Sequence, residues 1–115
     1  MTPIPDWTVD FPGAVTVCDA AGRIVSMNAA AARVFAKDGG EALVGKDVRA
    51  CHPERARGKL DELLAGGAPN AYTIEKAGRR KLIYQAPFWK DGRLAGVVEL
   101  SLELPADMPH FVRAP

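Results

Sequence analysis

The order of its predicted elements indicates that this chain folds as an α+β domain, with five antiparallel strands and helices gathered on one face of the sheet. Two short strands come first, two helices follow, and three longer strands come last. Because strands and helices occupy separate runs instead of alternating, a parallel βαβ sheet is not expected. The 115 residues suit one domain, and 48% hydrophobic and 25% charged residues are usual for a globular protein.

A β-hairpin is predicted at the start of this domain. Residues 15–18 alternate valine with threonine and cysteine, which is the period of a half-buried strand. Asp19 can hydrogen-bond its own backbone, and Gly22 accepts the positive φ that a tight turn needs. Residues 24–25 therefore begin the second strand.

The first helix is predicted to begin at Asn28. The side chain of this residue can accept hydrogen bonds from the first free N–H groups of a helix, and the alanines after it favour helix. Ala31, Val34 and Phe35 then share one face. Residues 37–40 end this helix, because glycine suits the position after a helix C-terminus.

The longest helix is predicted over residues 53–65. Pro53 suits the first helical position, where no backbone N–H is needed. The helix ends at the glycine pair of residues 66–67. Its apolar face comprises Ala56, Leu60, Leu63 and Leu64.

Three further strands are predicted over residues 72–76, 81–88 and 94–103, with an Asp-Gly hairpin turn at residues 91–92. The alternation gives each of the last two strands an apolar face, which we expect to lie toward the helices. That face comprises Leu82, Tyr84, Ala86, Phe88, Val98, Leu100 and Leu102. The opposite, outer face is then expected to carry Ile83, Val97, Glu99, Ser101 and Glu103.

These motifs, in this order and spacing, resemble a PAS domain. The first matching segment is Asp19-x-x-Gly22-Arg23-Ile24-x-x-x-Asn28-x-Ala30-Ala31, which ends at Phe35. The second is Leu43-Val44-Gly45-Lys46, and the third is Asp91-Gly92-Arg93-Leu94-Ala95-Gly96-Val97-Val98-Glu99. The resemblance covers residues 11–104, which leaves residues 1–10 as a flanking arm and residues 105–115 as a tail. It implies a PAS-like five-stranded sheet, a ligand pocket between the sheet and the long helix, and a sensory role.

The predicted faces suggest which side chains line that pocket. The candidates are Val17, Phe35, Val48, His52, Leu60, Leu63, Tyr84, Phe88, Val98 and Leu100. Such a cavity would be largely apolar, as is typical of small-ligand sites, with His52 and Tyr84 supplying polar atoms. The same bulky side chains could instead form a filled core without a ligand.

The segment Cys51-His52-Pro53 resembles one PAS subgroup that carries these residues before the long helix. The resemblance implies that His52 could be an axial haem ligand. The alternative is a neutral histidine packed at a helix start, which is the commoner role of a lone histidine. The helix N-terminus favours a Cys51 thiolate, so Cys51 is a redox candidate, although a small buried side chain is the commoner role. We expect no cofactor and no metal, with haem on His52 as the alternative.

Flavin adduct chemistry is not expected. Light-sensing PAS relatives carry Asn-Cys-Arg-Phe after the glycine, whereas this chain has Asp, Val, Arg and Ala at residues 47–50. The adduct-forming cysteine is therefore replaced by Val48.

The sequence also limits the classes of function. A net charge of +1 gives no basic excess for nucleic acid, and no apolar run is long enough to cross a membrane. The first ten residues do not resemble a signal peptide, and two cysteines without a disulfide pattern favour the cytoplasm. Common catalytic motifs are absent from the sequence, so an enzyme is not expected.

The expected partners follow from the absence of an output module in the sequence. Without a kinase or cyclase segment, the chain is expected to signal by contact with another protein chain, in response to a small apolar or mixed ligand. Trp7, Val9 and Phe11 alternate in the arm, which either covers the domain itself or forms a dimer contact. We expect a homodimer through the outer face of the sheet and this arm.

Overall fold

A computed structural model describes residues 5–115, apart from the side chain of Cys51. Its strands are β1 (Ala14–Asp19), β2 (Ile24–Met27), β3 (Asn70–Lys76), β4 (Arg79–Lys90) and β5 (Arg93–Leu104). Its α-helices are α1 (Ala29–Val34) and α2 (Glu54–Leu64). Short 3-10 turns at Ala36–Asp38, Gly40–Leu43 and Val48–Cys51 connect the two.

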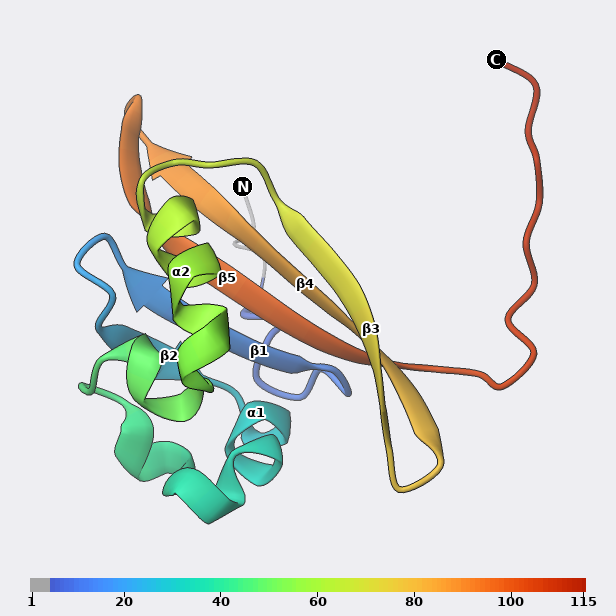
Figure 1. The fold of residues 1–115 in the computed structure, drawn as a ribbon, viewed down its shortest axis with the longest axis horizontal. Helices are drawn as coiled ribbons and strands as arrows, with labels where there is room; N and C mark the ends of the chain where they lie inside the picture. The colour runs from blue at the N-terminus through green and yellow to red at the C-terminus, as the bar shows by residue number, and fades with distance from the viewer. Residues whose placement is uncertain (1–4) are drawn as a thin grey trace.

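The five strands form one antiparallel sheet in the order β2-β1-β5-β4-β3. In Figure 1, α2 lies in front of the middle of this sheet, and α1 with the 3-10 turns lies beside the β1–β2 end. The α+β architecture with helices on one face, as predicted from the sequence, is therefore confirmed. The predicted strand positions also agree, although β4 and β5 extend one or two residues further at each end than the apolar pattern indicated.

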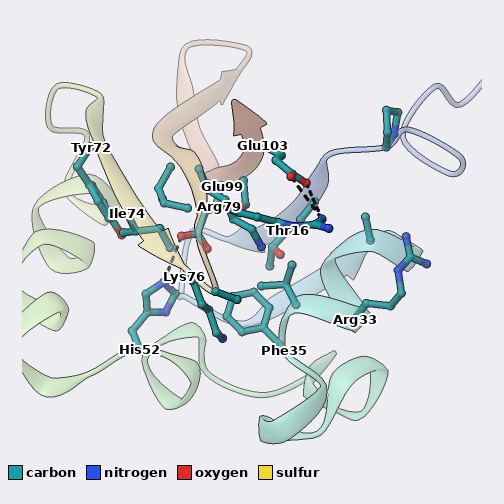
Figure 2. Close-up of a pocket in the computed structure, with 18 residues that line it drawn as sticks. Thr16, Arg33, Phe35, His52, Tyr72, Ile74, Lys76, Arg79, Glu99 and Glu103 are labelled. Atoms are coloured by element: carbon teal, nitrogen blue, oxygen red, sulfur yellow. Dashed lines mark hydrogen bonds and ion pairs between the residues drawn. The ribbon is translucent and has the colours of Figure 1, made fainter. Parts of the chain in front are cut away.

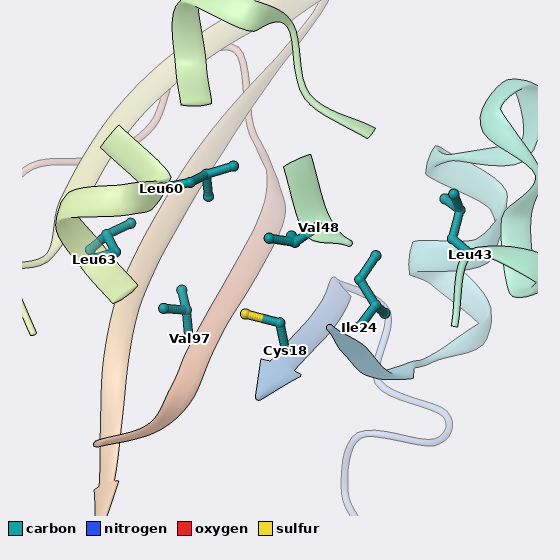
Figure 3. Packing of buried hydrophobic residues seen from close by; sticks show 7 residues of the cluster. All are labelled: Cys18, Ile24, Leu43, Val48, Leu60, Leu63 and Val97. Atoms are coloured by element: carbon teal, nitrogen blue, oxygen red, sulfur yellow. The ribbon is translucent and has the colours of Figure 1, made fainter. Parts of the chain in front are cut away.

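The main core lies between α2 and the β1–β5 pair. Its buried members are Cys18, Ile24, Leu43, Val48, Leu60, Leu63 and Val97 (Figure 3). Leu60 and Leu63 are 3% and 0% exposed, as the amphipathic pattern of the long helix predicted. Fully burying a leucine side chain contributes about 1.5–3 kcal/mol, so these two side chains are the principal attachment of α2 to the sheet.

The predicted faces of β4 and β5 are wrong. Val97 lies in the core against α2, and its neighbour Val98 must point to the other side because side chains alternate along a strand. The pairings Ala86↔Val98, Tyr84↔Leu100 and Phe88↔Gly96 carry this assignment across to β4. Tyr84, Phe88, Val98 and Leu100 therefore face away from the helices, while Ile83, Val97, Glu99, Ser101 and Glu103 face them.

The cause of this error is physical. A shift of one residue exchanges the two faces of a strand, and an apolar pattern selects between them only when one face is clearly polar. Here both faces carry apolar side chains, since Ile83 and Val97 on the inner face are 6% and 4% exposed. The more continuous apolar row proved to be the outer one.

The outer face is partly covered by the chain that enters β1, which lies behind the sheet in Figure 1. A side chain at Gly13 would collide with both Phe11 and Leu102, which shows that these two side chains lie close together. The rings of Trp7 and Phe11 contact edge-to-face, with 5.1 Å between their centroids. Trp7 is nevertheless 58% exposed. The arm thus packs on its own domain through Phe11 and leaves Trp7 accessible.

Asn28 connects this arm, β1 and α1. Its Oδ1 accepts hydrogen bonds from the backbone N–H groups of Ala31 (2.9 Å) and Val15 (3.0 Å). Its Nδ2 donates to the carbonyl oxygens of Thr8 and Gly13, both at 2.9 Å. The predicted helix cap is confirmed, and the same buried amide also satisfies groups on two other segments.

An Asn28→Ala substitution is therefore expected to lower the free energy of unfolding by about 3 kcal/mol. A lost cap alone costs about 1 kcal/mol, and each buried backbone group left without its partner adds a further penalty. Urea melts with unchanged m-values would measure the loss. Ser26→Ala, an exposed position two residues earlier, is the control and should shift stability by less than about 0.5 kcal/mol. A loss for Asn28→Ala as small as that of the control would contradict this role.

Candidate functional site

A cavity of about 550 Å³ lies on the helix side of β3, β4 and β5, bounded by α1 and by the segment that carries His52 (Figure 2). Phe35, Tyr72, Ile74 and Ile83 give it apolar walls. Its volume falls in the range of small-molecule sites, about 300–1,000 Å³.

Glu99 of β5 is the central polar group of this cavity, and only 14% of its side chain is exposed. Its Oε1 accepts a hydrogen bond from Gln85 Nε2 at 3.0 Å and lies 3.4 Å from His52 Nε2. Its Oε2 is buried and has no hydrogen-bond partner among residues 5–115. A buried acceptor left in this state costs free energy that a suitable donor would recover.

Glu99 belongs to a polar row that crosses three strands. Asn70, Gln85 and Glu99 are cross-strand partners on β3, β4 and β5. Asn70 Nδ2 donates to Gln85 Oε1 at 3.0 Å, which orients the Gln85 amide so that its Nε2 donates to Glu99. The row holds the carboxylate in a fixed position.

His52 closes the other side of the cavity. It has extended backbone angles (φ −122°, ψ 147°), as expected before a proline, and Pro53 is the N-cap of α2 instead of its first helical residue. His52 Nδ1 lies 2.9 Å from the Val48 carbonyl oxygen, and Nε2 faces Glu99. Both of these partners are acceptors, so whichever ring nitrogen carries a proton donates to the partner that it faces.

Basic side chains from three elements line the same cavity as this carboxylate. Arg33 of α1, Lys76 of β3, and Arg79 and Lys81 of β4 all line the cavity. Arg79 is paired with Glu103 at 3.4 Å. Burial, with a smaller contribution from the Glu99 charge, raises the pKa of Tyr72, so this phenol remains a hydrogen-bond donor at neutral pH.

The predicted pocket residues fall into three groups. Phe35 and His52 line the cavity. Val48, Leu60 and Leu63 belong to the filled core instead. The remaining candidates, which the structure places on the outer face, are Val17, Tyr84, Phe88, Val98 and Leu100.

Sequence reasoning missed Glu99 and Gln85 as site residues. A signal was present, because each is a polar residue in the middle of an otherwise apolar strand. Gln85 is only 3% exposed, and buried polar side chains on adjacent strands usually bond to one another. The prediction assigned Glu99 to the outer face of the sheet, where a dimer contact was expected, and so did not count it among the pocket residues.

The two cysteines differ in what the structure describes. The side chain of Cys51, the redox candidate, lies outside the described residues. Cys18 is a buried free thiol whose pKa is raised by burial, so it behaves as a small core residue. Within the described part of the chain, no cluster of three or more His, Cys, Asp or Glu side chains could hold a metal ion. No helix in this part is long and apolar enough to cross a membrane.

The class of protein is defined by comparison with known families. The model of the PAS fold family matches residues 10–105. The chain therefore belongs to the PAS fold family, whose members are generally sensory domains and not catalysts. A search of curated protein sequences finds no match.

Solved structures show the same fold at low sequence identity. The C-terminal domain of a Streptococcus mutans protein is 16% identical with a TM-score of 0.68, and covers 89% of this chain and 90% of its own. The Aer2 receptor of Vibrio cholerae, described as a dual PAS-heme oxygen sensor, is 15% identical with a TM-score of 0.63, covering 81% and 95%. The PAS domain of Bordetella pertussis BvgS is 22% identical with a TM-score of 0.62, covering 85% and 81%.

The residues present do not fit a haem ligated by His52. An axial ligand needs one ring nitrogen with a free lone pair directed at the iron. In this chain Nδ1 faces the Val48 carbonyl, which leaves Nε2 as the nitrogen that would bind iron, and Nε2 is directed at the Glu99 carboxylate at 3.4 Å instead of at open space in the cavity. A buried carboxylate at this place also conflicts with the apolar surroundings of a porphyrin.

Purified protein mixed with haem is accordingly expected to show no stable Soret band that depends on His52. Absorption spectra of the natural chain and of a His52→Ala variant would be compared after removal of unbound haem. His110, in the tail, provides the control substitution His110→Ala. A band present in the natural chain and in the control but lost in His52→Ala would overturn this conclusion.

Proposed function

We propose that this chain is a non-catalytic sensory module that binds a small organic ligand in the cavity around Glu99 and passes its ligand state to another protein chain. The observation that carries the proposal is a cavity of about 550 Å³ with apolar walls, in which the largely buried Glu99 is held in place by a hydrogen bond from β4. A cavity of this volume with apolar walls and a few fixed polar groups is typical of small-molecule sites. The PAS fold of the chain agrees with this role.

The position of Glu99 suggests how a ligand would be sensed outside the cavity. Glu99 lies on β5 between Val98 and Leu100, which point to the opposite face of the sheet. A displacement of the β5 backbone at Glu99 therefore moves both neighbours on the outer face. The tightly packed sheet transmits such shifts instead of absorbing them.

The outer face is our proposed contact surface, and its occupant is a second copy of this chain. Half-buried and exposed apolar side chains continue across three strands there, formed by Val17, Tyr84, Phe88, Val98, Leu100 and Leu102. A net charge of +1 produces little repulsion between two copies. A contiguous apolar patch on a small protein is typical of a contact surface.

A haem sensor is the less favoured alternative, because the histidine ring nitrogens are engaged as described above. Membership of the subgroup with Cys-His-Pro before the long helix stays a prediction. We also propose a cytoplasmic location, which is consistent with the reduced Cys18 thiol in the core.

Filling the cavity is expected to abolish ligand binding while the fold is kept. Ser101 lines the cavity beside Glu99 on β5, so Ser101→Trp would occupy its volume. Thermal shifts over a library of small organic molecules should show compounds that stabilise the natural chain but not this variant. Lys90→Trp, at the exposed β4–β5 hairpin, should respond like the natural chain. Equal shifts in the natural chain and in Ser101→Trp would place binding elsewhere.

A charge on the outer face is expected to prevent self-association. Leu100→Lys would place an ammonium group within the apolar patch, where desolvation in an interface is unfavourable. Sedimentation equilibrium should show a dimer for the natural chain and a monomer for this variant. Asp38→Lys, at an exposed position beyond α1, is the control and should remain dimeric. A natural chain that stays monomeric at high micromolar concentration would disprove the proposed dimer.

A further inference from the structure

The edge of the sheet formed by β3 is open, whereas the opposite edge is covered by the chain itself. We propose that β3 is a docking edge for another protein, which adds an extended segment of its own chain to the sheet as a further strand. The segment runs antiparallel to β3 and carries β-branched or aromatic side chains at alternate positions, with an acidic residue at one end. This contact is separate from the proposed ligand and from the proposed dimer on the outer face.

The covered edge is β2, at the other end of the strand order. This strand has four residues, and its first residue is already engaged on the open side. The Ile24 N–H donates to the Lys46 carbonyl oxygen at 2.8 Å, and the Gly45 N–H donates to the Ile24 carbonyl oxygen at 2.7 Å. Arg23, just before β2, is bridged to Asp47. The chain between α1 and α2 therefore occupies the place that an added strand would need.

The β3 edge has no such cover. Among residues 5–115, the pairing partners of β3 all lie on β4, and no backbone hydrogen bond reaches β3 from outside this hairpin. In Figure 1, β3 forms the border of the sheet beside β4. Alternate residues of an edge strand direct their N–H and C=O groups to the open side. β3 therefore offers a row of backbone donors and acceptors whose spacing matches another extended chain.

The devices that usually protect an exposed edge are missing from β3. Natural edge strands are kept from pairing by shortness, proline, bulges or charges that point inward. β3 has seven residues and no proline, and it pairs with β4 through seven successive residue pairs without a register shift. Tyr72 and Ile74, on its helix-facing side, are 40% and 38% exposed. A long, regular edge with accessible apolar side chains is suited to strand addition.

The side chains of β3 define the chemistry of the partner segment. Tyr72 and Ile74 line the cavity, so alternate side chains of an added strand would lie at the border of that cavity. Cross-strand pairs between aromatic and β-branched residues are favourable, which gives the partner its apolar positions. Lys76 continues the same face and forms no ion pair within residues 5–115. An acidic residue opposite Lys76 supplies the complementary charge.

Other occupants of this edge fit less well. The tail of the same chain contains Pro105, Pro109 and Pro115, which cannot donate to a ladder, and all residues of 105–115 are exposed. A second copy at β3 would extend the assembly beyond the proposed dimer, because each chain would then have two self-complementary contacts. A segment of a different protein adds one strand and leaves the dimer unchanged.

Hydrogen exchange of the full natural chain tests whether the edge is free. Alternate β3 amides should exchange rapidly, because they face solvent, and the others should exchange slowly, because they donate to β4. The Ile24 amide, on the covered β2 edge, is the control and should exchange slowly. Slow exchange at every β3 amide would overturn the proposal.

Random linear peptides displayed on phage and selected on the full chain supply the probes for strand addition. Selected peptides should alternate β-branched or aromatic residues and, when bound, should protect the rapidly exchanging β3 amides. N-methylation of one alternate set of peptide amides should weaken binding at least about tenfold, whereas methylation of the other set should be tolerated. A selection that yields no binder, or equal effects of the two methylated sets, would overturn the proposal.

Matched variants locate the contact on the protein. Ile74→Lys places an inward-pointing charge on the β3 edge and should weaken binding of the selected peptides at least about tenfold. Val25→Lys makes the same change at a 49% exposed position of β2 and should bind them like the natural chain. Unchanged binding by Ile74→Lys would overturn the proposal. Self-association that persists in Leu100→Lys and disappears when Ile74→Lys is added would assign the edge to a second copy and would also overturn it.

Discussion

The alternation of side chains along β5 is the constraint on which the core, the site and the proposed contact surface all depend. On its inner face Val97 packs against α2, and two residues further along Glu99 reaches the cavity. On its outer face Val98 and Leu100 contribute to the apolar patch. Because the side-chain period is two, none of these assignments can change without changing the others. One strand in the centre of the sheet thus fixes three surfaces at once.

The local features of the fold were predictable, because each depends on a few adjacent residues. The Asn28 cap, the Asp91-Gly92 turn and the buried face of α2 are set by backbone chemistry and helical period, which the sequence displays directly. The face of β5 depends instead on which side the helices occupy. That choice is a tertiary one, and two apolar faces on one strand give no local preference for it.

The same limitation explains which part of the site was predicted. His52 and Phe35 come from segments beside the helices, so their approach to the cavity followed from the turn and helix pattern. Glu99 can be recognised as a site residue only from its cross-strand neighbours Gln85 and Asn70. The strand register places these two residues beside it, although they are distant from it in the sequence. A largely buried carboxylate is a rarer feature than a buried histidine, and its burial depends on the tertiary fold, which the sequence of β5 alone does not display.

The polar row gives the site a property that an apolar pocket would lack. An apolar cavity of this size would accept many ligands of suitable volume, because burial of apolar surface is not directional. In this chain Asn70 donates to Gln85, Gln85 donates to one oxygen of Glu99, and the second oxygen is buried without a hydrogen-bond partner among residues 5–115. The cavity wall therefore carries fixed polar groups held from three strands, and the proposed ligand would press on β5, the strand that also forms the outer face.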